Sequence, residues 1–332
     1  MTNQYHEYNF HLLVLGPVHI GNGSTYSAKD YIYENNGYYF PDLGKMYLQL
    51  SPAKRAAFES FLQTKDRKKL IDFIHHQNIT ARDFGGYTIK ASNFETDKKG
   101  RLNEIRAFVK DPYGNPYIPG SSLKGALRTI LINEKFTQGD KNIPWGHEDD
   151  IFNEIRVSDS KPIEKDRLII VQKWDLNRRN LDPKSLPLYR EALKPMTKID
   201  FTITTTSLRA TELIDQLPQL AERMYEHYRQ YFLADYPDRF VQDNRHAPLY
   251  LGAGSGLWTK VDRHHVNLEK IIKGTPSKMK MKGKGVMKLT RYQRKNRIQI
   301  NRQTGERKRF PLINNDQSFY EMGKCGFTLK RK

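Results

Sequence analysis

The sequence contains a single cysteine, Cys325, among its 332 residues. One thiol excludes an internal disulfide framework and a zinc site built on cysteines, and it fits a reducing compartment. Long apolar runs are also missing, since no stretch approaches the ~20 residues that a membrane helix needs. The apolar run at 12–15 is too short for a signal peptide, and no basic region precedes it. We therefore expect a cytoplasmic protein without a membrane segment.

Familiar catalytic and cofactor motifs are absent too. No Walker-type phosphate loop occurs, and the glycines at 252, 254 and 256 miss the Gly-x-Gly-x-x-Gly dinucleotide fingerprint because position 257 is leucine. The adjacent pairs His75–His76 and His264–His265 are poor metal signatures, since neighbouring residues do not share a helix face. The acidic run at 148–150 is expected to be a solvated loop. The sequence therefore predicts no catalytic residue, no metal site and no cofactor.

Acidic residues are scarce relative to basic ones: 37 Asp and Glu stand against 56 Lys and Arg, a net charge of +19. Residues 260–332 hold 21 basic and 5 acidic residues, whereas residues 1–259 hold 35 and 32. A nearly neutral body with a strongly basic end segment is typical of a protein that binds a polyanion. Nucleic acid fits best. An anionic membrane surface or another polyanion, bound through residues 278–309, is the competing interpretation.

Hydrophobic periodicity predicts strands and helices in the order β…α…β…β…α…β, with strands at 8–20, 155–159, 198–207 and 323–329. The two helices of this pattern begin near Ser122 and Thr211. This order is that of a ferredoxin-like, RRM-type α+β core, and it leaves one sheet face free, as in RNA-recognition domains. The 19 tyrosines among basic residues also favour stacking on bases, although most are expected in the core.

Two insertions are expected to interrupt this core. A helical insertion covers about residues 42–85, where Ser51 caps a helix that starts at Pro52. A β-hairpin (thumb) insertion covers about 87–115 and has the polar tip 97–100. We expect residues 1–260 to form the core with these insertions, and residues 261–332 to form a basic segment whose last strand returns to the core. The polar stretch 177–187 is expected to be mobile, and the basic stretch 274–285 to be disordered until an anion binds.

The stretch 119–128 is the strongest candidate site. Ser121 or Ser122 can cap a helix, and apolar residues follow at helical spacing. Lys124 and Arg128 lie four residues apart and share one face. Free amides, the positive end of the helix dipole and two cations suit a phosphate, with Gly120, Ser121 and Ser122 presenting the amides. The alternative is an ordinary capped helix with a solvated basic face.

Further candidates surround this helix start. His19 lies beside the glycine turn at Gly21, and the glycines at 252, 254 and 256 imply a tight twist or a close approach by RNA. An ordinary structural turn is the alternative for these glycines. The predicted RNA-binding set is His19, Gly21, Gly120, Ser121, Ser122, Lys124, Gly125, Arg128, Gly252, Gly254, Gly256 and Lys260. Contacts of this kind position a backbone without reading its sequence.

Asp97 supports a second hypothesis about function. A carboxylate on a projecting hairpin could hold a metal ion against an RNA backbone, so the alternative to a binding protein is a metal-dependent ribonuclease. Ordinary turn chemistry also accounts for an aspartate at this position.

Several motifs together resemble the RAMP proteins of type III CRISPR systems. The segments that carry the resemblance are 17–23 (PVHIGNG), 117–128 (YIPGSSLKGALR), 156–160 (RVSDS), 198–201 (KIDF) and the glycine run after Leu251. The likeness extends over most of the chain. It is greatest to the subunit of the type III-A (Csm) effector complex that caps the 3′ end of the guide RNA.

This resemblance implies an RNA-recognition-like core with a protruding hairpin, a place at one end of a filament of related subunits, and guide-RNA (crRNA) binding. The implied partners are crRNA, nearby target RNA, RAMP backbone subunits, small helical subunits and host nucleases. It also implies a role in crRNA maturation and antiviral defence through partners rather than through catalysis. Sibling subunits cleave target RNA with an aspartate, but Asp97 matches that position only loosely, so the activity is not carried over.

Overall fold

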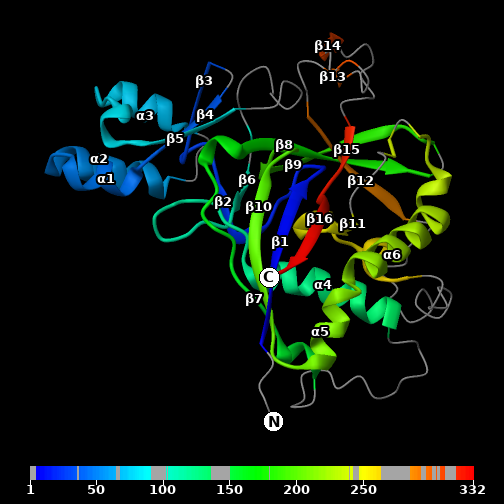
Figure 1. The fold of residues 1–332 in the computed structure, drawn as a ribbon. Coiled ribbons are helices and arrows are strands. Elements are labelled where there is room, and N and C mark those ends of the chain that lie inside the picture. Colours follow the sequence, from blue (N-terminus) through cyan, green and yellow to red (C-terminus); the bar gives the residue numbers. More distant parts are fainter. Residues whose placement is uncertain are drawn as a thin grey trace, which may run out of the picture.

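The computed structural model describes residues 5–35, 37–64, 68–90, 102, 104–135, 150–178, 180–238, 240–241, 247–262, 285–292, 297–300, 304, 307–310 and 319–332. Within these ranges two large sheets are accompanied by a three-stranded sheet and a two-stranded ribbon (Figure 1). None of the helices in the described ranges is long and apolar enough to cross a membrane.

The first sheet has the strand order β11–β16–β1–β10–β7, and all of its neighbouring strands are antiparallel. Its strands are β1 (His6–Val14), β7 (Ile155–Val157), β10 (Lys198–Thr205), β11 (Ala247–Tyr250) and β16 (Lys324–Arg331). If β11 is left aside, the sheet order β16–β1–β10–β7 places the fourth, first, third and second strands of a βαββαβ unit side by side. The two helices of this unit are α4 (Gly120–Lys135) and α6 (Leu217–Tyr231). The predicted ferredoxin-like α+β core is therefore confirmed.

The second sheet has the order β15–β12–β8–β9–β6–β2 and is antiparallel except between β6 and β9. Its strands are β2 (Gly21–Tyr26), β6 (Ile105–Phe108), β8 (Leu168–Asn177), β9 (Pro183–Leu193), β12 (Val286–Arg291) and β15 (Phe319–Glu321). The prediction of a mobile stretch at 177–187 is wrong from Pro183 onward. This part is polar, but pairing with β8 makes it a strand.

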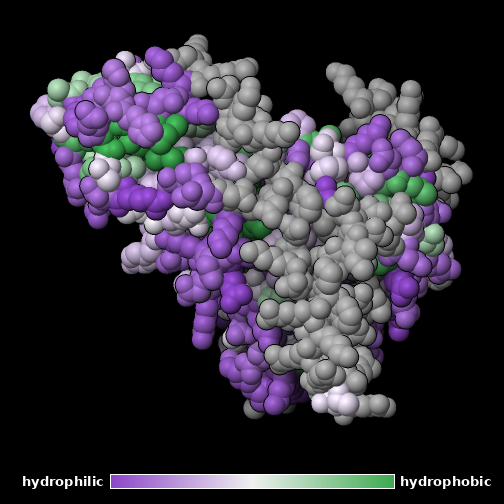
Figure 2. Space-filling view, turned by 90° about the horizontal axis from the view of Figure 1, so that it is seen from above, coloured by the Kyte–Doolittle hydropathy of each residue, from purple (hydrophilic) through white to green (hydrophobic). Residues whose placement is uncertain are grey.

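A separate lobe contains the three-stranded sheet β3 (Ile32–Glu34), β4 (Gly37–Pro41) and β5 (Gly86–Lys90) with α1 (Leu43–Gln49), α2 (Pro52–Gln63) and α3 (Leu70–His76). It has its own apolar cluster around Met46, Phe58 and Phe73. Ser51 caps α2 as predicted. Seen from above, this lobe projects at one side, and hydrophobic residues form a band in its polar surface (Figure 2).

The strands that flank the expected hairpin tip do not pair with each other. β5 pairs with β4, whereas β6 pairs with β2 and β9. The described parts of 87–110 thus belong to two different sheets rather than to one two-stranded hairpin. The tip with Asp97 lies outside the described residues.

The last strand, β16, confirms the strand predicted at 323–329 and lies between β1 and β11. The remaining elements are α5 (Leu208–Asp215), α7 (Leu257–Lys260), β13 (Arg297–Ile300), β14 (Arg307–Phe310) and the short 3₁₀ helices Ala81–Phe84, Ile151–Glu154, Lys165–Arg167, Leu233–Asp235 and Gly252–Gly254. Most of the basic stretch 274–285 lies outside the described residues. The domain boundaries at 260 and around the insertions stay a prediction.

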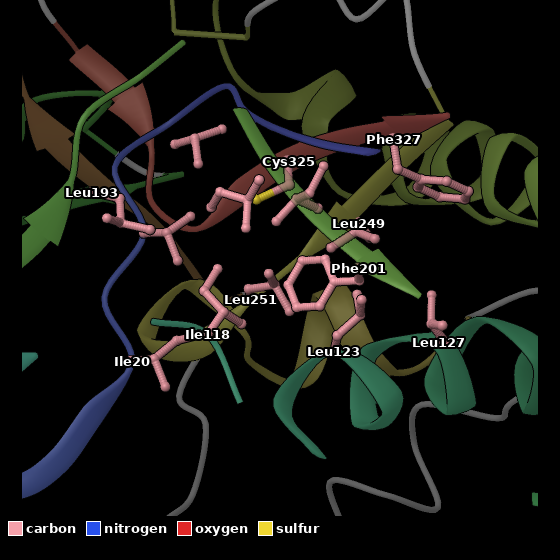
Figure 3. Packing of buried hydrophobic residues seen from close by; sticks show 14 of the residues in the cluster. Ile20, Ile118, Leu123, Leu127, Leu193, Phe201, Leu249, Leu251, Cys325 and Phe327 are labelled. Atoms are coloured by element: carbon pink, nitrogen blue, oxygen red, sulfur yellow. The ribbon is translucent and has the colours of Figure 1, made fainter. Parts of the chain in front are cut away.

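A continuous apolar core joins α4 to both sheets. In Figure 3, Leu123 and Leu127 of α4 point toward Phe201 and Leu249 of the first sheet. Ile118, Leu193, Leu251 and Ile20 extend the same cluster toward the second sheet. Cys325 is fully buried within it, and burial raises the pKa of its thiol. The lone cysteine is therefore a core residue.

Candidate nucleic-acid interface

The start of α4 differs from the predicted cap. The helix begins at Gly120, and the Pro119 carbonyl accepts hydrogen bonds from the amides of Ser122 (2.9 Å) and Leu123 (3.3 Å). The Gly120 amide donates to Asp159 Oδ1 at 2.7 Å. The Ser N-cap prediction is therefore wrong, and the Gly120 amide is already occupied. Glycine is required at this position because a Cβ would clash with the carbonyls of β7 and the residue after it.

Arg128 also has a different role from the one predicted. Its guanidinium forms an ion pair with Asp150 (2.9 Å) and lies over the Phe152 ring, 4.4 Å from its centroid. Asp150 is buried, so the acidic run at 148–150 is not simply a solvated loop at this residue. This carboxylate already neutralises Arg128, so a phosphate would have to compete with it, and the phosphate contact of Arg128 stays a prediction.

Lys124 lies on the same side of α4 as Arg128. Burial first, and then the Arg128 and Arg156 charges, lower the pKa of Lys124, while Asp150 opposes this effect. Lys124 does not line the cleft with Ser121 and Ser122, and a phosphate contact shared by the three stays a prediction.

A cleft of about 290 Å³ lies between α4, α6, β11 and α7. Its lining includes five of the predicted residues, namely Ser121, Ser122, Gly125, Gly252 and Lys260. Gly125 is informative because a Cβ built on it would meet no atom within 4 Å. Glycine inside a helix costs about 1 kcal/mol relative to alanine. No packing reason among the described residues accounts for this cost, so the glycine keeps open space in the cleft wall.

The glycine run bends tightly against other backbone segments. Gly252 has φ +58°, and a Cβ there would clash with the His19 carbonyl; at Gly254 it would clash with the Met322 carbonyl. Close backbone packing therefore requires glycine at both positions, and their contact with RNA stays a prediction. Gly256 differs, since its Cβ position lies 3.0 Å from the flexible end of Lys288.

His19 is buried and packs against this glycine turn. Its imidazole is 5% exposed, its Nδ1 lies 2.7 Å from the Glu191 carbonyl oxygen, and its own carbonyl accepts from the Ala253 amide. Burial lowers the pKa of His19 to about 4, so the ring is neutral at pH 7. His19 therefore lies inside the fold next to the glycine turn, and its contact with RNA stays a prediction. Gly21 lies directly beside it, since a Cβ there would be 3.0 Å from His19 Nε2.

Sequence reasoning missed a basic cluster formed by Arg106, Arg190, Lys288 and Lys173 from four strands of the second sheet. Arg190 is 7% exposed, and its Nε has no hydrogen-bond partner in the part of the chain that the structure describes. Burial and the neighbouring Arg106 charge lower the pKa of Arg190, with Asp175 opposing them. Asp175 partly offsets these charges, since its carboxylate forms an ion pair with Lys173 at 2.9 Å. No sequence signal identifies these residues, because only strand pairing brings them together.

Lys288 connects this cluster to the glycine run. Its ammonium donates to the Ser255 carbonyl oxygen at 2.5 Å, and burial with the nearby Lys173 and Arg190 charges lowers its pKa. It lines a second cleft of about 740 Å³, together with Gly254, Gly256 and Trp258. The glycine turn and α7 thus separate two clefts, with Lys260 in the first and Lys288 in the second.

The outer face of the first sheet lacks the stacking surface of RNA-recognition domains. Those domains stack bases on aromatic side chains of their central strands. In the central strands β1 and β10, the aromatic residues Tyr8, Phe10 and Phe201 are buried, whereas His11 and Asp200 are exposed. These two strands therefore offer polar contacts rather than ring stacking.

The RAMP superfamily model matches residues 11–326 of the chain. This chain is a RAMP protein. It is 44% identical to the CRISPR system Cms protein Csm5 of Streptococcus thermophilus over 361 aligned positions, covering 99% of each chain. It is 30% identical to Csm5 of Mycobacterium tuberculosis, covering 75% of this RAMP chain and 81% of the relative. Within the superfamily, the chain therefore belongs to the Csm5 family.

Solved structures share the RAMP fold. A chain of the type III-A Csm–crRNA–target RNA ternary complex superposes with a TM-score of 0.67 at 18% identity, covering 97% of this chain and 100% of that one. The crystal structure of T. onnurineus Csm5 gives 0.55 at 19% identity, covering 95% and 99%. At these identities the likeness establishes the α+β fold.

Proposed function

We propose that this protein binds guide RNA through the two clefts beside the glycine turn. The open space at Gly125 carries the proposal, because the fold tolerates an unfavourable helix glycine where an incoming backbone would approach. Ser121 and Ser122 line the same wall, and Lys260 adds a positive charge. Lys288 lines the second cleft and extends the positive charge beyond the turn.

The subunit further acts, in this proposal, at the 3′ region of crRNA at one end of a cytoplasmic type III-A ribonucleoprotein. Its neighbours would be RAMP backbone and small helical subunits, with target RNA close by. Membership of the Csm5 family and the fold of a chain in a Csm–crRNA–target RNA complex support this role. The proposed contribution to crRNA maturation and antiviral defence is non-catalytic and works through partner nucleases.

Replacing Gly125 with leucine tests the proposal. The side chain would project into the cleft, so we expect at least a tenfold loss of affinity for a guide-length RNA in a fluorescence anisotropy titration. Helix stability should rise, because leucine is the better helix former. Gly44→Leu is the matched control: Gly44 is an exposed helix glycine in α1, outside both clefts. Equal affinities for both variants and wild type would contradict the site.

Lys288→Met, which removes the lysine that lines the second cleft, provides a second arm of the same experiment. Removing one phosphate contact should lower the log–log salt slope of RNA binding by about 0.7. Arg209→Met, on the exposed surface of α5, should leave the slope unchanged. RNA cleavage by the purified wild-type protein with Mg²⁺ or Mn²⁺ would instead favour the ribonuclease hypothesis.

A further inference from the structure

Three side chains from distant parts of the chain converge next to the first cleft. They are Glu134 at the end of α4, His227 in α6 and Asp262 just after α7. One possible ligand atom from each lies within 4.8 Å of the other two. His227 Nδ1 is 2.5 Å from Asp262 Oδ2 and 3.7 Å from Glu134 Oε1. The sequence pattern indicated no metal ligands because these residues are far apart along the chain.

The Glu134 carboxylate is the unexplained member of this group. Its side chain is 1% exposed, and neither oxygen accepts a hydrogen bond from an N–H group within the described residues. The side chain of Asp262 is 0% exposed, so two carboxylates share one dry site. Burying an ionised carboxylate without hydrogen bonds or a counter-charge is strongly unfavourable.

The arginine that faces this carboxylate from α6 does not satisfy it. Arg223 Nε lies 3.8 Å from Glu134 Oε2, beyond hydrogen-bond distance, and the arginine side chain is 57% exposed. It can turn to solvent when another cation arrives.

We propose that Glu134, His227 and Asp262 bind a divalent transition-metal ion, Zn²⁺ or Mn²⁺, that joins α4, α6 and the segment after α7. One imidazole nitrogen with two carboxylate oxygens suits these ions, whereas Mg²⁺ and Ca²⁺ prefer all-oxygen sites. Small side-chain rotations bring the three donors to the ~2.0–2.2 Å distances of zinc–nitrogen and zinc–oxygen bonds.

The surroundings indicate a structural ion. Asn133 of α4 already holds the segment 260–262 in place, because its side chain donates to the Lys260 carbonyl oxygen (2.7 Å) and accepts from the Asp262 amide (3.0 Å). The cavity next to His227 and Asp262 is only about 10 Å³, room for about one water. An ion here would fix the backbone that positions Lys260 at the first cleft.

The test measures metal content of the full-length protein. Chelator-stripped protein is incubated with Zn²⁺ or Mn²⁺ and desalted, and the ion is quantified by mass spectrometry. We expect about one ion per chain for wild type and less than a tenth of that for Glu134→Gln and Asp262→Asn. His11→Gln is the matched control, since His11 forms an exposed histidine–carboxylate pair with Asp200 at 2.6 Å. It should retain the ion.

Thermal unfolding separates ligand loss from misfolding. Stripped Glu134→Gln should melt at or above the temperature of stripped wild type, because a neutral isostere replaces a buried acid. Metal at a hundredfold excess over Kd should raise the wild-type midpoint by about 5 °C or more and leave Glu134→Gln unchanged. Wild type that holds neither ion, or an ion retained by both variants, would overturn the proposal.

Discussion

His19 shows how burial changes the role of a residue. Its place in a glycine-rich segment makes it a candidate RNA contact in the sequence, but the fold buries its side chain next to the turn at Gly252. A histidine whose folded pKa is about 4 binds its proton less readily than the unfolded chain, whose pKa is near 6.5. The stability it contributes is complete above pH 6.5 and is lost as the pH falls toward 4.

We therefore expect the difference in unfolding free energy between wild type and His19→Gln to shrink by about 2 kcal/mol from pH 7 to pH 5. Urea titrations at the two pH values measure this. The pH dependence from Glu134 runs in the opposite direction: because its pKa is raised to about 7, the free energy of unfolding falls as the pH rises from about 4.5 to 7. This change is the same in both proteins and cancels in the difference between them. A pH-independent difference at His19 would contradict the buried neutral ring.

At the scale of elements, the sequence predicted the order of strands and helices along the chain but not the contacts of α4. Alternating apolar residues predicted β1, β10 and β16, and their spacing with the two helices gave the ferredoxin-like order. The Gly120–Asp159 bond and the Arg128–Asp150 pair depend on segments 22 or more residues away, so no local pattern contains them. A combined replacement of Lys124 and Arg128 would break a buried ion pair, and it is therefore a poor test of RNA contacts.

The glycine turn makes a prediction at this scale. Gly252→Ala combines an unfavourable φ with a clash against the His19 carbonyl, so we expect a loss of about 3 kcal/mol in urea unfolding. Gly23→Ala is the matched control, since Gly23 has φ +90° but open space around its Cβ position. It should lose about 1 kcal/mol. Similar losses in both variants would mean that the close backbone contact at Gly252 is not retained in solution.

For the whole molecule, charge distribution predicted a polyanion partner without locating the contact. The basic residues of the sheet cluster are dispersed along the sequence, whereas the conspicuous stretch 274–284 lies outside the described residues. The sheet cluster and the stretch 274–284 would both bind RNA by neutralising phosphates, so the salt dependence of RNA affinity can measure the contribution of each.

Glutamine at positions 278, 280, 282 and 284 tests the basic stretch. We expect weaker RNA binding and a salt slope flattened by up to about 0.7 per lost contact. The control replaces four lysines of the helical lobe, at 45, 54, 68 and 69, and so changes net charge equally. Equal effects of both sets would mean that total charge alone matters. Flotation with anionic vesicles tests the membrane alternative, which requires vesicle binding to fall with the first set.

The position of β16 has a consequence for how the protein is made. β1 pairs along its length with β16, from Tyr8 opposite Arg331 to Val14 opposite Cys325. β1 is synthesised first, but β16, with which it pairs, is synthesised near the end of the chain. The first sheet and the core that packs against it therefore form only after residue 331 has left the ribosome. Shortened products, such as a chain ending near residue 274, cannot complete the fold, so translation supplies either a finished subunit or a substrate for cellular proteases.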